Sequence, residues 1–109
     1  MKIPLKHPDG RAMKAWELLD SPEKWTQNAF ARDELGYPMV PSNMSHREPC
    51  SFCVAGAILC CYGELAGWAK VDRLSMQLTV LQGLSATVWN DLDTTTWKDV
   101  HALLRKLDI

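Results

Sequence analysis

The chain has 109 residues, of which 47% are hydrophobic and 23% are charged. This balance is typical of one globular domain with a core of its own. The 12 basic and 13 acidic residues nearly cancel and are interspersed, so the chain lacks the concentrated positive charge that binds nucleic acid or an anionic membrane. We therefore expect a single domain over residues 1–109 that binds neither nucleic acid nor membrane.

The first third of the sequence predicts two helices after a short lead-in. Residues 1–9 carry charges and prolines without an apolar run, so we expect an extended segment rather than a secretory signal, and a cytoplasmic location. Apolar residues then recur at helical spacing over residues 12–19. Ser21 followed by Pro22 and Glu23 is typical of a helix start, which predicts a second helix over residues 22–34.

A long loop is predicted next. Gly36 ends the second predicted helix, and residues 37–49 contain Pro38, Pro41 and Pro49 among small polar residues. Loops of this length in compact domains are commonly functional or mobile.

Residues 50–63 hold all four cysteines and no charged residue. A segment that is apolar all round predicts a buried helix at the centre of the domain, over about residues 49–63. Cys53, Gly56, Ala57 and Cys60 share one face of that helix. Because all four side chains are small, we expect another helix or a ligand to approach this face closely.

The rest of the chain predicts two further helices. Residues 64–72 are expected to form a turn and one short helical turn, and residues 74–88 a helix. A polar turn over residues 89–93 follows. Thr96 stands three residues before Asp99, as in a capping box, and predicts a last amphipathic helix that ends near Leu107. The predicted fold is all-α: a compact single-domain bundle of four to five helices packed around the central apolar helix.

The cysteines allow two interpretations. His46, Cys50 and Cys53 form an H-x3-C-x2-C pattern, and thiolate and imidazole are ligands that zinc prefers, but a fourth ligand is missing. Cys50 near a helix N-terminus is also a candidate nucleophile, although no known nucleophile motif surrounds it. The favoured interpretation is that the cysteines are reduced, small core side chains. No cofactor is indicated.

Polar residues on the predicted second helix and on the turn near residue 90 form a candidate cluster. Arg32 extends the apolar stripe of Trp25 and Ala29, so its guanidinium needs a partner, for which Asp91 or Asp93 is a better geometric candidate than Asp33. The candidate binding residues are Trp25, Gln27, Arg32, Asp33, Trp89, Asn90 and Asp91.

This cluster has two interpretations. The favoured one is a structural clamp that ties the second helix to the turn before the last helix. The other is a polar pocket walled by Trp25 and Trp89, in which Arg32 binds an anion or carboxylate and Asp91 orients it.

Three motifs resemble a known family. They are W-x-Q-x3-A-R-D-x2-G from Trp25 to Gly36, C-x2-G-A from Cys53 to Ala57, and W-N-D from Trp89 to Asp91. Together they resemble a family of small bacterial and phage proteins known only as a domain of unknown function. The resemblance covers about residues 16–107 and implies a small helical domain, but it supplies no activity or catalytic residue.

The leading interpretation is a small cytoplasmic non-enzymatic protein, of bacterial or phage origin, that binds a protein partner or a small polar or anionic ligand. The first alternative is a small enzyme or ligand-binding domain with a polar pocket around Arg32 and Asp91. The second is a metal-binding module that uses His46, Cys50 and Cys53. The sequence does not define the oligomeric state.

Overall fold

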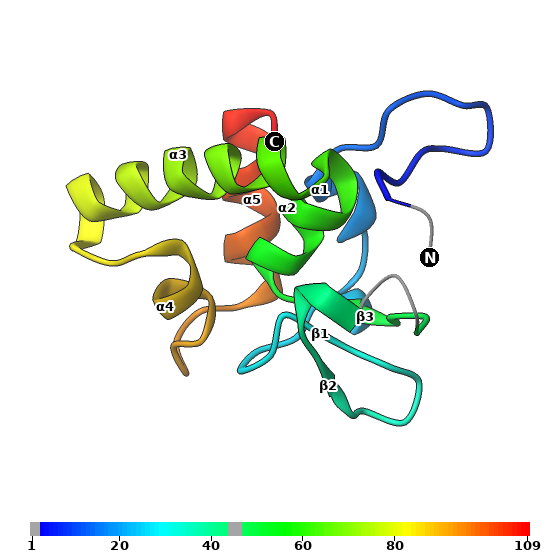
Figure 1. The fold of residues 1–109 in the computed structure, drawn as a ribbon. Coiled ribbons are helices and arrows are strands. Elements are labelled where there is room, and N and C mark those ends of the chain that lie inside the picture. The colour runs from blue at the N-terminus through cyan, green and yellow to red at the C-terminus, as the bar shows by residue number, and fades with distance from the viewer. Residues whose placement is uncertain (1–2, 44–46) are drawn as a thin grey trace.

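The computed structural model describes residues 3–43 and 47–109 (Figure 1). It contains five α-helices in the described part of the chain: α1 (Ala15–Leu18), α2 (Val54–Tyr62), α3 (Glu64–Gln82), α4 (Ala86–Asn90) and α5 (Trp97–Leu107). It also contains three short strands, β1 (Ala31–Arg32), β2 (Pro38–Met39) and β3 (Ser51–Phe52), and two 3-10 turns, Pro22–Lys24 and Pro41–Asn43. The fold is therefore mostly helical. The predicted all-α class is not correct, because the described residues also form a small sheet.

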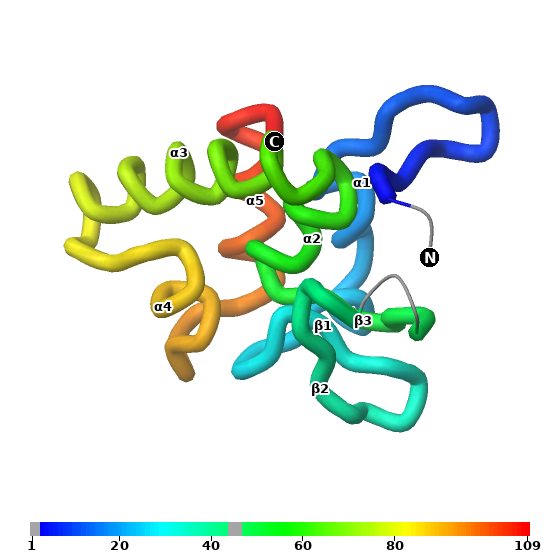
Figure 2. The backbone as a smooth tube through the Cα atoms, viewed as in Figure 1, coloured from blue at the N-terminus to red at the C-terminus, as the bar shows by residue number. Residues whose placement is uncertain are grey.

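Helix α2 is the centre of the core. Eight of its nine residues are buried, and the helix contacts α1, α3, α4 and β3. Figure 2 shows it enclosed by the other helices and by the strands. The prediction of a central apolar helix is confirmed, but the helix starts later, at Val54. Cys53 caps it, because its Sγ accepts a hydrogen bond of 3.3 Å from the Gly56 N–H.

The predicted second helix is wrong. Residues 22–24 form one 3-10 turn, Trp25 then forms a β-bridge, and residues 27–30 follow as a series of bends. Trp25 forms a parallel bridge with Phe52, and the Thr26 N–H donates to the Phe52 carbonyl at 3.0 Å. Asn28 has a φ of 64°, in the left-handed region that interrupts a right-handed helix. Pairing with β3 therefore prevails over the local helix-start pattern.

Strand β1 lies in the middle of a small antiparallel sheet of order β2-β1-β3. Ala31 is opposite Met39 on one side and opposite Phe52 on the other. The turn between β1 and β2 depends on Asp33, whose Oδ1 accepts from the N–H groups of Leu35 and Tyr37. The predicted loop over residues 37–49 thus begins with a strand, and its residues 44–46 lie outside the described residues.

The small-residue face of α2 is approached closely, as predicted, but not by a helix. A Cβ atom added to Gly56 would lie 2.0 Å from the carbonyl oxygen of Phe30. The same oxygen accepts a 2.9 Å hydrogen bond from the Cys53 N–H. Glycine at position 56 is therefore needed for the backbone at Phe30, just before β1, to pack directly on α2.

Helix α3 is longer than predicted. Residues 64–72, expected to be mainly a turn, are its first half, and only Gly63, with a φ of 82°, separates it from α2. Gly67 is buried within α3 and packs against Leu59 of α2. The predicted helix over residues 74–88 is divided at Gly83, which adopts the left-handed conformation that ends α3.

The first predicted helix is shorter than expected, whereas the last one forms as expected. The first helix has one turn, from Ala15 to Leu18, rather than the span 12–19. The last helix is confirmed: Thr96 caps α5, and Thr96 and Asp99 form a reciprocal capping box. None of the described helices is both long enough and apolar enough to cross a bilayer.

Candidate functional site

The candidate cluster is organised around Asn90, at the end of α4. Its side chain is fully buried. Asn90 Oδ1 accepts hydrogen bonds from Trp25 Nε1 at 2.8 Å and from the Val54 N–H at 2.9 Å. Asn90 Nδ2 donates to the Thr26 carbonyl at 3.1 Å and to Asp91 Oδ1 at 3.0 Å. One amide therefore links the segment before β1, the start of α2 and the end of α4.

Gln27 and Asp91 strengthen the same junction. Gln27 Nε2 donates to the carbonyl oxygens of Asn90 and Leu92, at 2.9 and 2.8 Å. Asp91 Oδ1 accepts from the Asn28 N–H at 2.8 Å. These bonds give hydrogen-bond partners to two backbone carbonyls and one backbone N–H. Without them, these groups would have to bond water or remain unpaired. These bonds tie the segment before β1 to the end of α4, as a structural clamp would, although that segment is a series of bends rather than the predicted helix.

Arg32 belongs to a different set of contacts. Its Nε donates to Thr26 Oγ1 at 2.9 Å, and its two Nη atoms donate to the carbonyl oxygens of Gln27 and Gly36, each at 3.0 Å. The guanidinium thus bonds neutral oxygens rather than Asp91 or Asp93, which corrects the expected ion pair. Its role in the structure is to join the segment before β1 to the β1–β2 turn.

Asp33 is a residue of that turn. Besides accepting the two backbone N–H groups, it forms an ion pair with Arg47. Partial desolvation raises the pKa of Asp33, but the N–H of Tyr37, the Arg47 guanidinium and the N–H of Leu35 together hold it below its usual value. Asp33 therefore stabilises the turn as a carboxylate.

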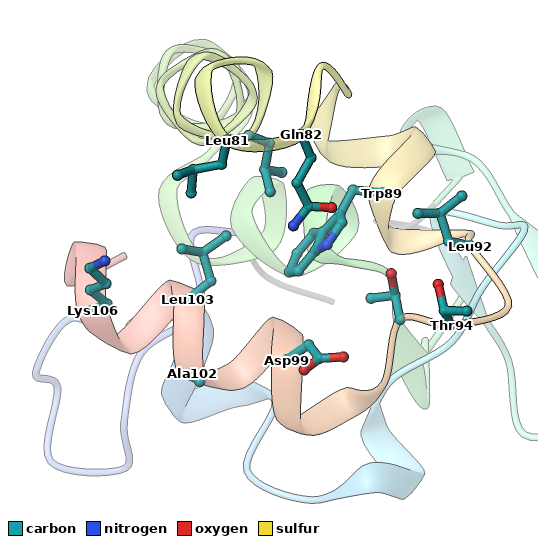
Figure 3. A pocket seen from close by; sticks show the side chains of 11 residues that line it. Leu81, Gln82, Trp89, Leu92, Thr94, Asp99, Ala102, Leu103 and Lys106 are labelled. Atoms are coloured by element: carbon teal, nitrogen blue, oxygen red, sulfur yellow. The ribbon is translucent and has the colours of Figure 1, made fainter.

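The three side chains of the W-N-D motif lie in three different places. Asn90 points into the core, as described above. Trp89 lines a groove of about 450 Å³ between α3, α4 and α5, which we call the helical groove (Figure 3). Its apolar wall includes Leu81 and Leu103, while Asp99 and Lys106 lie at its polar edge. Asp91 lines a separate cleft, and Trp25 is among the lining residues of neither.

The cleft at Asp91 lies between the β1–β2 hairpin, the start of α2 and α4, and we call it the hairpin cleft. Its volume is also about 450 Å³. Most of its lining is apolar, and Asp91 is the acidic group among the lining residues, which are Asn28, Ala29, Phe30, Pro38, Met39, Val40, Cys53, Thr87 and Asp91. The arrangement combines an apolar wall with one carboxylate, as small-ligand sites commonly do.

The cysteines are poor candidates for nucleophiles. Burial raises the pKa of the Cys53 thiol to about 11 and that of the Cys60 and Cys61 thiols to about 12. These three are protonated near neutral pH, whereas the thiolate is the reactive form. Cys50 is exposed and lies before β3 rather than at a helix N-terminus, so the predicted activation by the helix dipole is not available to it.

The alternative metal site is only partly within the described residues. His46 lies outside them, Cys50 is exposed, and the Cys53 sulfur accepts the Gly56 N–H at the start of α2. Within residues 3–43 and 47–109, no group of three or more His, Cys, Asp or Glu side chains is arranged to hold a metal ion.

Several residues of the hairpin cleft were not among the predicted site residues. Phe30 lies in the predicted second helix, whereas Met39 and Val40 lie in the predicted loop, so the sequence pattern places them on different elements. The available signal was D-E-L-G between two short apolar runs, which is typical of a hairpin turn ending in glycine. A hairpin turn at this position brings these three residues toward one another.

The fold and this site define a small, mostly helical domain with a three-stranded sheet, a buried asparagine clamp and an apolar cleft that ends in a carboxylate. Residues 12–107 match the model of a family of unknown function (DUF6197), and the chain belongs to that family. The match confirms the resemblance found in the sequence. Searches of curated proteins and of solved structures found no match.

Proposed function

We propose that this chain is a non-enzymatic binding protein whose ligand is an organic cation with an apolar body, held in the hairpin cleft. The observation that carries the proposal is the position of Asp91, a partly buried carboxylate that lines a cleft with otherwise mostly apolar walls. A volume of about 450 Å³ falls in the range of small-ligand sites. Phe30, which is half-buried, and Val40, which is exposed, provide the surface against which an apolar body packs.

The charge of Asp91 supports a cationic ligand. Asp91 Oδ1 accepts two N–H groups, from Asn28 and from the Asn90 side chain. Among the ion pairs between described residues, none involves Asp91. A carboxylate beside an apolar surface and without a cationic neighbour gains most from a ligand that brings the opposite charge.

The alternatives receive less support from the same geometry. An anion bound by Arg32 would compete with the three oxygens to which that guanidinium already donates. Covalent catalysis by Cys53 is disfavoured because burial keeps the thiol protonated. The helical groove carries both Asp99 and Lys106, and Asp99 already accepts the Thr96 N–H and hydroxyl.

A cytoplasmic location is part of the proposal, as is the bacterial or phage origin that the family resemblance implies. Four free cysteines in 109 residues support a reducing compartment, because free thiols in an oxidising one tend to form disulfides.

The test compares two probes of nearly equal shape, 2-phenylethylamine and 2-phenylethanol, by titration into ¹⁵N-labelled protein followed by NMR. We expect the amine to shift the amide signals of the hairpin cleft with a Kd on the order of 1 mM, and to bind about fivefold to tenfold more tightly than the alcohol. Asp91→Asn keeps an oxygen that accepts the Asn28 N–H and should make the two probes equal.

Asp93→Asn is the matched control, because Asp93 is an exposed carboxylate two residues away and outside the cleft. It should leave the preference for the amine unchanged. Equal binding of both probes to the wild-type protein would refute the role of the Asp91 charge. If the amine shifts no amide signal of the cleft at concentrations well above the expected Kd, the proposal as a whole is overturned.

A further inference from the structure

Helix α3 carries apolar side chains on two opposite sides. Gly67, Val71, Leu74 and Leu78 are buried and face the core. On the opposite side, Leu65 is 91% exposed, Met76 is 70% exposed and Val80 is 84% exposed. Figure 2 shows α3 along one edge of the molecule. We call this second side the outer face; its residues are Leu65, Ala69, Asp72, Arg73, Met76 and Val80, all of them exposed.

The outer face has the spacing of a helix–helix contact. Single exposed apolar residues are normal on protein surfaces, but positions 65, 69, 72, 76 and 80 follow one another at intervals of three or four residues. That spacing keeps side chains in one row along a helix and is the pattern of a packed seam between two helices.

The row is symmetric about its own centre, between Asp72 and Arg73. Leu65 and Val80 lie at equal distances from this point in the sequence, and so do Ala69 and Met76. When two such helices pair antiparallel about a two-fold axis, each large apolar residue at one end meets the one at the other end. We infer that the outer face of α3 binds the outer face of α3 in a second copy of this chain.

The charges at the centre favour the same arrangement. In the antiparallel pair, Asp72 of each chain lies opposite Arg73 of its partner, and the axis produces two such ion pairs. A parallel pair would instead place Asp72 against Asp72 and Arg73 against Arg73. Arg73 Nη2 donates to the Leu107 carbonyl at 3.2 Å at the exposed end of α5, which leaves its other N–H groups to a partner carboxylate.

The size of this face sets the expected strength. The row from Leu65 to Val80 spans about 22 Å at roughly 1.5 Å per residue. One helix pair of that length buries less than the roughly 1,200 Å² that stable interfaces need, so the dimer should be weak, with a Kd on the order of 10–100 µM.

Sedimentation velocity over protein concentrations from about 5 to 500 µM measures this association. Met76→Glu places two like charges near the seam and should raise the Kd at least tenfold. Leu35→Glu is the matched control, because Leu35 is 76% exposed and belongs to the β1–β2 turn. It should leave the Kd unchanged.

A charge-reversal cycle distinguishes this seam from any other contact. Asp72→Arg alone and Arg73→Asp alone should each weaken the dimer, while the double variant restores the two ion pairs and should return the Kd to within about threefold of wild type. Melting temperatures of the three variants at low concentration report separately on the monomer. A protein that stays monomeric at about 500 µM overturns the inference. A dimer that Met76→Glu leaves intact would show that another surface mediates it.

Discussion

The buried Asn90 amide offers the sharpest test of the clamp. Asn90→Ala removes all four of its side-chain hydrogen bonds at once. Asp91 Oδ1 keeps a donor in the Asn28 N–H. Three groups then lose the side-chain partner that the clamp gives them: the Trp25 indole N–H, the Val54 N–H and the Thr26 carbonyl.

Each buried polar group left without a partner costs about 1–3 kcal/mol. The Val54 N–H is buried, while the Trp25 and Thr26 groups are partly buried and gain some compensation from water. We therefore expect the free energy of unfolding to fall by about 3–5 kcal/mol, a large share of the stability of a domain of this size. The corresponding decrease in Tm is about 12–20 °C.

Urea and thermal unfolding followed by circular dichroism measure this loss. Asn43→Ala is the matched control, because Asn43 Oδ1 accepts one N–H, that of Val40, in an exposed turn. It should cost less than about 1 kcal/mol. If Asn90→Ala costs no more than Asn43→Ala, the cluster does not hold the segments together and the clamp is refuted.

Three further predictions concern other parts of the fold. Gly56→Ala should destabilise the protein by about 2–4 kcal/mol in urea unfolding, because the new methyl group meets the Phe30 carbonyl; an unchanged midpoint would contradict that close approach. Cys50 should react rapidly with a thiol reagent at pH 8 and the three buried cysteines slowly, so Cys50→Ser should abolish the fast phase. The pKa of Asp33 is lowered on folding, so its stabilising contribution is present above its unfolded pKa of about 3.9 and is lost as the pH falls through the lower folded value. Asp33→Asn should therefore flatten the acid limb of the stability–pH curve, and an unaltered limb would contradict this.

The elements that the sequence predicted well are those whose signals are local. Residues 54–62 are apolar on every side, so the segment is buried in any compact fold and forms α2. The Thr96–Asp99 capping box and the apolar stripe after it lie within α5 itself. Neither prediction requires the position of any other helix or strand.

The segment from residue 22 to residue 39 could not be predicted in this way. Its S-P-E start produced only the Pro22–Lys24 turn, because Trp25 and Ala31 pair with Phe52, which is more than twenty residues away. Strands of two residues are too short to show the alternating pattern by which strands are recognised. The contacts that decide this segment are therefore long-range.

The candidate site was predicted in composition more accurately than in geometry. Gln27, Asn90 and Asp91 do form one network, because a polar run beside tryptophan in an apolar chain needs internal partners. The sequence places Arg32 in the same network because it lies on the inner face of the predicted second helix. Arg32 is in strand β1 instead, and its guanidinium donates to other oxygens. The hairpin cleft was not predicted because it depends on the β1–β2 turn, which the predicted second helix does not contain.

The structural clamp and the proposed binding site are linked rather than exclusive. Helix α4 has only five residues, and isolated helices of that length are unstable. Besides its packing against α2 and α3, its position depends on the hydrogen bond from the Val54 N–H of α2 to Asn90 and on the bond from the Gln27 side chain to the Asn90 carbonyl. Under the proposed function, these bonds hold Asp91 at the cleft. Asn90→Ala should then lower stability and amine binding together, whereas Asp91→Asn should lower the preference for the amine with a much smaller change in the unfolding midpoint.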